Sequence, residues 1–298
     1  MRPLTLTILL SMLIASGCTE PAAVTTSTTT TAPKTTTSTT STTVPPDSAF
    51  VTDERIPFTD LLVLDVFQPT ADSTGTVVVL VHGGGWIGGE RADVVDLAAL
   101  LATNGVVVYN ISYRTMALGG RYPTTYDDVA CGVRFARTTA AGYGGDPERV
   151  ILIGYSAGAH LSAVIALAGD EFAGECVGPE ASPLPDGFIG LAGPYDSNEF
   201  SPLLIPFFGG STTATPDSWA AGNPFSYVER RPNLPVHLLH GAVDGTVPAS
   251  FTTDFAEALE SAGHQVQVTV IEGAGHRDMV DPAGEGQRVV EAVFDLLP

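Results

Sequence analysis

Strand-like and helix-like patterns alternate along most of the chain. Segments of strand length and composition cover 61–67, 76–81, 106–111, 150–153, 187–192, 235–240 and 265–271. Segments with a helical pattern cover 92–103, 126–140, 159–168, 250–262 and 285–297. The run over 76–81 is almost continuously apolar, as expected of a strand covered on both faces. This alternation from residue 76 to the end predicts an α/β fold with a doubly wound, mostly parallel sheet.

Two stretches break the alternation, 179–185 and 197–232. Both are irregular in pattern and contain several prolines. Because the second is long, we expect it to form a loop or a small cap rather than a further domain.

The first 18 residues follow a different pattern. Arg2 precedes an apolar run over 4–15 that is too short to span a bilayer, and small residues then lead to Cys18. This arrangement predicts a signal peptide over 1–17. It resembles the lipobox of bacterial lipoproteins, which implies a lipid anchor on Cys18. Plain secretion is the alternative.

The next stretch, over 18–46, consists almost wholly of Thr, Ser, Pro and Ala. It cannot bury enough apolar surface to offset the entropy of ordering, so we expect a disordered tether. The catalytic domain is then expected over 47–298. Its expected location is outside the cytoplasm, anchored by lipid to the bacterial cell envelope or secreted.

Composition and charge narrow the choice of partners and compartment. The chain is 44% hydrophobic, enough for a sizeable core, and its formal net charge is −20. Nucleic acid requires a basic surface, so no nucleic-acid partner is expected, and the only membrane contact is the anchor on Cys18. Cys131 and Cys176 are the remaining cysteines. An oxidising compartment favours a disulfide between them, and two buried free thiols are the alternative.

A serine stands in a sharp turn between a predicted strand and a predicted helix, in Gly154-Tyr155-Ser156-Ala157-Gly158. A Cβ atom at either glycine would collide with nearby backbone in such a turn. The free N–H groups at the start of the helix can face developing negative charge. The setting favours Ser156 as a nucleophile over a merely structural turn.

Position relative to the sheet selects a base for Ser156 from six histidines. In open α/β sheets the chemistry lies at the carboxyl ends of the strands. His276 follows the strand over 265–271 and lies at this edge, whereas His264 precedes the same strand. The others are expected to be structural: His160 and His237 packed inside elements, His240 at a strand end, and His82 pinning a glycine loop.

Asp244 is the expected third member of the site. It stands four residues past the strand that ends at His240, where a carboxylate can orient His276 and stabilise its cation. Asp278 is the alternative, although it lies close to His276 in sequence. The chain order Ser156, Asp244, His276 is that of α/β-hydrolases.

A glycine-rich loop, His82-Gly83-Gly84-Gly85-Trp86, ends the strand over 76–81. Glycines let backbone N–H groups approach a carbonyl oxygen, so we expect Gly84, Gly85 and Ala157 to form an oxyanion hole. A phosphate-binding loop is the alternative. However, the loop has neither a Gly-Lys-Ser/Thr ending nor a Gly-x-Gly-x-x-Gly helix start.

Together these motifs resemble those of α/β-hydrolase carboxylesterases with an HGGG or HGGxW oxyanion loop. Over 60–298 the chain is similar to hormone-sensitive-lipase-like and feruloyl- or acetyl-esterase-like enzymes, and to the kynurenine formamidases. The matching motifs are His82 to Trp86, Tyr113-Arg114, Arg121-Tyr-Pro123, Gly154 to Gly158, His240-Gly241 with Asp244 and Val247-Pro248, and Gly275-His276. No large cap domain is expected, because the Thr-rich stretch occupies its place, and this favours an open, shallow site.

The resemblance implies a serine carboxylic-ester hydrolase that acts through an acyl-enzyme on short-chain or small acyl esters, with no cofactor and no metal. The alternatives are an aryl-formamidase-like amide hydrolase, an acetyl xylan or feruloyl esterase acting on wall polymers, and a tethered pseudoenzyme that only binds. Trp86, Tyr155 and Tyr195 are candidate pocket walls, with core packing as the alternative for each. Oligomeric state does not follow from the sequence.

Overall fold

The computed structural model describes residues 48–71 and 73–297. The predicted signal peptide over 1–17, the lipidation site Cys18 and the predicted tether over 18–46 lie outside these residues.

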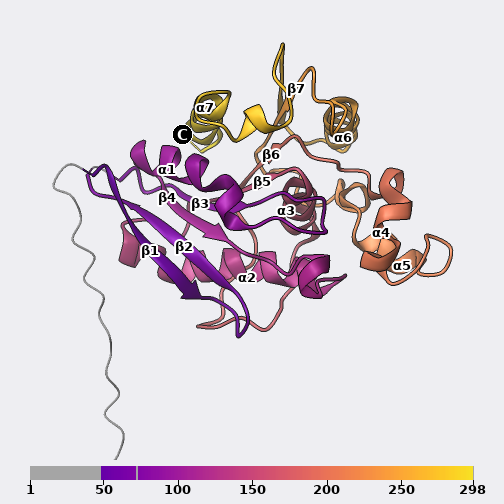
Figure 1. Ribbon diagram of the computed structural model, residues 1–298, viewed down its shortest axis with the longest axis horizontal. Coiled ribbons are helices and arrows are strands. Elements are labelled where there is room, and N and C mark those ends of the chain that lie inside the picture. Colours follow the sequence, from indigo (N-terminus) through magenta and orange to yellow (C-terminus); the bar gives the residue numbers. More distant parts are fainter. Residues whose placement is uncertain (1–47, 72, 298) are drawn as a thin grey trace, which may run out of the picture. The chain divides into compact units, whose positions relative to one another are not determined.

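Eight strands form one sheet in the order β1-β2-β4-β3-β5-β6-β7-β8 (Figure 1). They are β1 (Phe50–Pro57), β2 (Val63–Pro69), β3 (Val77–Val81), β4 (Val107–Ile111), β5 (Val150–Tyr155), β6 (Gly187–Leu191), β7 (Val236–Gly241) and β8 (Val266–Ile271). Strand β2 pairs antiparallel with β1 and β4, and all later neighbours are parallel. The mostly parallel α/β fold expected from the sequence is confirmed.

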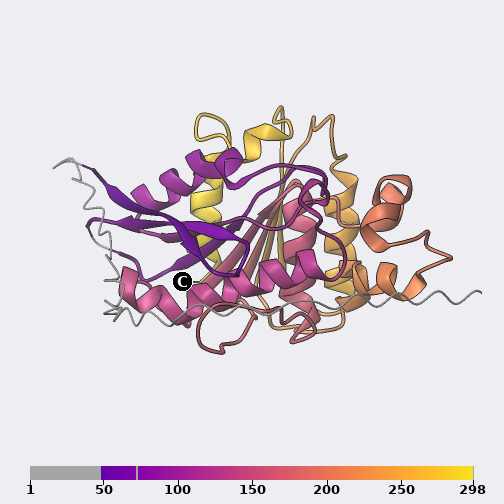
Figure 2. The same cartoon turned by 60° about the horizontal axis from the view of Figure 1, so that its bottom comes forward.

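Helices cover both faces of this sheet. They are α1 (Val95–Thr103), α2 (Thr124–Thr139), α3 (Ala157–Ala168), α4 (Ser201–Phe208), α5 (Pro216–Ala221), α6 (Ser250–Ser261) and α7 (Gly286–Leu296). Figure 2 shows α1 and α7 above the sheet and α2 below it. None of the helices between residues 48 and 297 is long and apolar enough to cross a membrane.

Strand β3 shows how the sequence supplies a core on each face. Val77, Val79 and Val81 pack with residues of α2 and α3, whereas Val78 and Leu80 pack with residues of α1 and α7. Alternate side chains point to opposite faces, so a strand covered on both sides needs apolar residues at every position. All five side chains are fully buried, and each contributes about 1.5–3 kcal/mol through burial.

Two parts of the fold were not resolved by the sequence pattern. Strand β1 was not predicted, because its central residues Asp53, Glu54 and Arg55 are exposed and, within the described part of the chain, it pairs with β2 alone. The stretch over 197–232 contains the short helices α4 and α5. In Figures 1 and 2 both helices lie at one end of the sheet, next to α6.

Candidate active site

Ser156 lies in the turn between β5 and α3 with a backbone conformation that residues bearing a side chain rarely adopt. Its φ is 54° and its ψ is −124°, a strain of about 1–3 kcal/mol that the surrounding contacts must hold. The Ser156 N–H donates to the carbonyl of Leu191 in β6 at 2.8 Å. A Cβ on Gly154 would overlap the carbonyl of Gly158, and one on Gly158 would overlap that of His82. The glycines therefore permit the turn that holds the serine at the carboxyl edge of the sheet.

Three side chains that follow three different strands meet at this edge. Oγ of Ser156 lies 3.0 Å from Nε2 of His276, and Nδ1 of His276 lies 2.6 Å from Oδ2 of Asp244. A carboxylate only accepts, so Nδ1 carries the proton and Nε2 is free to accept from the serine hydroxyl. The structure thus brings the three predicted residues together in the arrangement of a nucleophile, a base and an orienting acid.

Backbone N–H groups hold the carboxylate of Asp244. Its Oδ1 accepts from Thr246 and Val247 at 2.8 and 2.9 Å. Burial alone would raise the pKa of Asp244, but the hydrogen bonds from Val247, His276 and Thr246 outweigh it and hold the pKa below its usual value. Asp244 is therefore ionised at neutral pH. The alternative acid, Asp278, accepts instead from the Gly275 N–H at 2.7 Å and shapes the loop that carries the base.

The glycine loop faces Ser156 from the end of β3. Gly84 and Gly85 have φ values of +119° and +60°, which favour glycine. Within the described part of the chain, no protein acceptor faces their N–H groups or that of Ala157, the first residue of α3, whose N–H has no intrahelical partner. These donors are free to bind a developing oxyanion.

His82 anchors this loop, as expected from the sequence. Its Nδ1 donates to the Gly83 carbonyl at 2.7 Å, and its ring stacks on Tyr113 with centroids 4.2 Å apart. The Tyr113 hydroxyl donates to the carbonyls of His82 and Gly83 at 3.1 and 3.2 Å. Burial lowers the pKa of His82 to about 4, so the ring is neutral at neutral pH.

A hollow of about 360 Å³ opens onto Ser156. It is lined by Gly83, Gly84, Gly85, Asp93, Tyr155, Ser156, Thr246, His276 and Arg277. Four of these were not predicted as site residues, and one of the four, Gly83, belongs to the glycine loop. Arg277 directly follows His276, and Thr246 lies two residues after Asp244. Closeness in sequence to these two residues was the signal that could have identified them. Asp93 lies in a short 3-10 helix and carries no such signal.

Of the three aromatic residues predicted as pocket walls, only Tyr155 lines the hollow. The prediction is wrong for Trp86 and Tyr195, whose side chains are buried in the core at 2% and 0% exposure. Tyr195 stacks on Phe255 of α6 with centroids 4.4 Å apart. Trp86 does not line the hollow, and its ring packs against that of His160 in α3. A sequence shows that an aromatic residue is present but not which way its side chain points.

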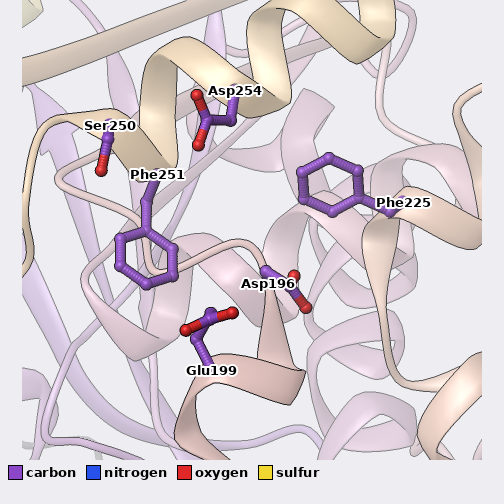
Figure 3. A pocket seen from close by; sticks show the side chains of 6 residues that line it. All are labelled: Asp196, Glu199, Phe225, Ser250, Phe251 and Asp254. Atoms are coloured by element: carbon purple, nitrogen blue, oxygen red, sulfur yellow. The ribbon is translucent and has the colours of Figure 1, made fainter.

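A second hollow, of about 390 Å³, lies at the start of α6 (Figure 3). Its walls carry three carboxylates and two phenyl rings, from Asp196, Glu199, Asp254, Phe225 and Phe251, together with Ser250. Asp196 is already engaged, because its Oδ1 accepts from the Asn223 amide at 3.1 Å. None of the residues predicted for the site lines this second hollow.

Two further predictions concern cysteines and metals. Cys131 of α2 and Cys176 form a disulfide in the structure, which ties α2 to the segment that follows α3. Among the described residues, no group of three or more His, Cys, Asp or Glu side chains is arranged to hold a metal ion.

Comparison with known proteins shows that this chain is similar to proteins described as esterases. Residues 64–259 match the sequence model of the family described as BD-FAE, a range that includes Ser156 and Asp244 but ends before His276. A probable isoprenylcysteine alpha-carbonyl methylesterase of Oryza sativa is 29% identical over 253 residues, or 78% of this chain and 60% of the relative. Esterase LipQ of Mycobacterium tuberculosis is 29% identical over 231 residues, or 74% and 54%.

The chain thus spans little more than half the length of these relatives. A thermophilic esterase of Thermogutta terrifontis, Est2 with propionate bound, has a TM-score of 0.66 at 24% identity. The match covers 85% of this chain and 95% of that structure. This likeness supports the fold.

Proposed function

We propose that this chain, which belongs to the BD-FAE family of α/β-hydrolase carboxylesterases, is a serine hydrolase that cleaves carboxylic esters through an acyl-enzyme on Ser156. The observation that carries the proposal is the pair of contacts from Ser156 to His276 and from His276 to Asp244, at 3.0 and 2.6 Å. The relatives described as esterases support an ester as the substrate class.

In the proposed reaction, Nε2 of His276 takes the proton of Ser156 as its Oγ attacks the ester carbonyl carbon. The carbonyl oxygen becomes an oxyanion that accepts from the N–H groups of Gly84, Gly85 and Ala157. The carbon–oxygen bond to the alcohol then breaks, and His276 returns the proton to the leaving alcohol. Water, deprotonated by the same imidazole, then attacks the acyl carbonyl carbon. The bond from this carbon to Oγ breaks, His276 returns the proton to Oγ of Ser156, and the carboxylic acid leaves, while Asp244 stabilises the imidazolium.

The hollow favours small acyl groups. Its wall consists of glycine backbone, polar side chains and one aromatic ring, that of Tyr155. A long acyl chain would find little apolar surface to cover it. We expect kcat/KM to fall from acetyl to octanoyl p-nitrophenyl esters, and a rise over that series would contradict the preference for short chains.

The decisive test of the proposed function is Ser156→Ala. It should lower hydrolysis of p-nitrophenyl acetate by about 10⁴-fold or more and abolish labelling by a fluorophosphonate probe. Ser162→Ala is the matched control, because Ser162 is buried in α3, the helix that follows Ser156, and its hydroxyl has no partner among the described residues. Folded wild-type protein that neither hydrolyses esters nor labels would instead indicate a binding module. Preferential turnover of aryl formamides would indicate the amide-hydrolase alternative.

The proposal extends to location, with the domain outside the cytoplasm and held by lipid on Cys18. The disulfide between Cys131 and Cys176 supports an oxidising compartment. Cys18→Ser should move the full-length protein from the membrane fraction to the soluble fraction. Wild-type protein found only in the medium would indicate plain secretion.

A further inference from the structure

A second histidine contacts the catalytic acid from inside the sheet. His240 is the penultimate residue of β7, and its side chain is fully buried. Its Nε2 lies 3.2 Å from Oδ2 of Asp244, the same oxygen that binds His276, and 2.8 Å from the carbonyl oxygen of Val247. Its Nδ1 lies 2.7 Å from Oγ1 of Thr252 in α6.

These partners fix the tautomer of His240. The carboxylate of Asp244 and the carbonyl of Val247 both accept hydrogen bonds and have no hydrogen to give, so Nε2 carries the proton. Nδ1 is then bare and accepts from the hydroxyl of Thr252. Burial is the main reason that the pKa of His240 is lowered, and Asp244 and His276 are the titratable groups that act on it. The ring is therefore a neutral donor aimed at the catalytic carboxylate.

We propose that His240 is a positioning residue that holds Asp244 in the rotamer required by His276. This inference rests on the proposed function and deepens it. The N–H groups of Thr246 and Val247 hold one carboxylate oxygen, and His240 and His276 share the other. Without the N–H of His240, Oδ2 loses the contact that sets its direction toward the base. The hydroxyl of Thr252 in turn fixes the orientation of the His240 ring. Helix α6 is therefore linked to Asp244 and His276 through uncharged groups.

The test compares two replacements of His240. The amide nitrogen of glutamine can take the place of Nε2, whereas that of asparagine reaches only the place of Nδ1. We expect His240→Asn to lower kcat by about 10- to 100-fold with little change in KM, because misplacement of a catalytic group costs about this much. His240→Gln should recover most of the rate. The control is His237→Gln, which should leave kcat unchanged. His237 lies on the same strand, and its Nε2 is 2.9 Å from Oγ1 of Thr269.

A double-mutant cycle separates positioning from general damage. Because His240 acts through Asp244, His240→Asn should have almost no further effect in an Asp244→Ala background, measured by fluorophosphonate labelling rates. The same fold-loss in both backgrounds, or equal losses for the asparagine and glutamine variants, would overturn the inference. If His240→Asn does not fold, a comparison of Thr252→Val with Thr252→Ser tests the inference instead. Valine removes the hydroxyl that donates to His240 and should lower kcat, whereas serine keeps the hydroxyl and should not. Failure of wild-type protein to label would instead refute the proposed function itself.

Discussion

The indole N–H of Trp86 donates a hydrogen bond to Nδ1 of His160 across 3.2 Å. Trp86 ends the glycine loop and His160 lies in the helix that begins after Ser156, so this bond joins the glycine loop to the helix that follows Ser156. Nδ1 accepts, so the proton of His160 is on Nε2. Burial lowers the pKa of His160 to about 3 and keeps the ring neutral. Trp86 therefore holds the glycine loop through this bond and does not line the hollow as predicted.

Removal of this bond should impair both stability and catalysis. Trp86→Phe leaves Nδ1 of His160 buried without its donor, which costs about 1–3 kcal/mol of unfolding free energy. The freed loop should also lower kcat by about 10-fold or more. The control is Trp219→Phe, which removes an indole N–H that donates to the Gly210 carbonyl at 2.9 Å. It should cost stability while leaving kcat intact, and equal rates in the two variants would argue against the role of Trp86.

Two neighbouring glycines should differ in their tolerance of alanine. A Cβ on Gly84 would overlap the carbonyl of Gly88, whereas a Cβ on Gly85 would meet open space. Gly84→Ala should therefore displace the oxyanion donors and lower kcat by about 10²- to 10³-fold. Gly85→Ala should add only a strain of about 1–2 kcal/mol at its positive φ. Kinetics with p-nitrophenyl acetate compare the two, and a reversed order would rule out this account of the loop.

Stability should fall as the pH drops below 6.5. The folded-state pKa is about 4 for His82 and about 3 for His160, against 6.5 when unfolded, so the unfolded chain binds protons first. Each histidine stabilises the fold fully above pH 6.5, and on the order of 2 kcal/mol of this is lost by pH 5.

Urea unfolding at several pH values checks this prediction. His160→Asn is a useful comparison, because its amide oxygen takes the place of Nδ1 as acceptor for Trp86 but does not titrate. It should unfold with a shallower dependence on pH than the wild type. A wild-type unfolding free energy that does not change between pH 7 and 5 would show that these rings are not held neutral.

The disulfide should stabilise the fold without affecting the chemistry. It closes a loop between residues 45 positions apart, which corresponds to about 4 kcal/mol by the chain-entropy estimate. A Cys131→Ala, Cys176→Ser double variant should unfold at a lower urea concentration while keeping wild-type kcat under native conditions. An unchanged midpoint, or wild-type protein that is insensitive to reductant, would contradict this.

The sequence predicted the central sheet and the site because both depend on local patterns. Burial on both faces demands the apolar run of β3, and the turn at Ser156 demands the glycines at 154 and 158. The rule that parallel strands end at one edge then selected His276 over His264. These conclusions need only the order of the elements and the direction of the strands.

Features that depend on side-chain direction were not predictable in this way. Tyr195 and Tyr155 look alike in sequence, yet one is packed beneath α6 and the other lines the hollow. His240 was expected to be structural, and its contact with Asp244 follows from the direction of its side chain in the fold. Strand β1 was missed because it is exposed at its centre and therefore has no apolar pattern to detect.

Among the described strands, β8 pairs with β7 alone, and most of its side chains are at least partly exposed. The base His276 follows this strand, whereas Ser156 follows β5 in the middle of the sheet. Fraying of an edge strand needs far less free energy than global unfolding. The lifetime of the proposed esterase activity under heat or denaturant should therefore be set by this one strand, because His276 moves away from Ser156 while the core is still intact.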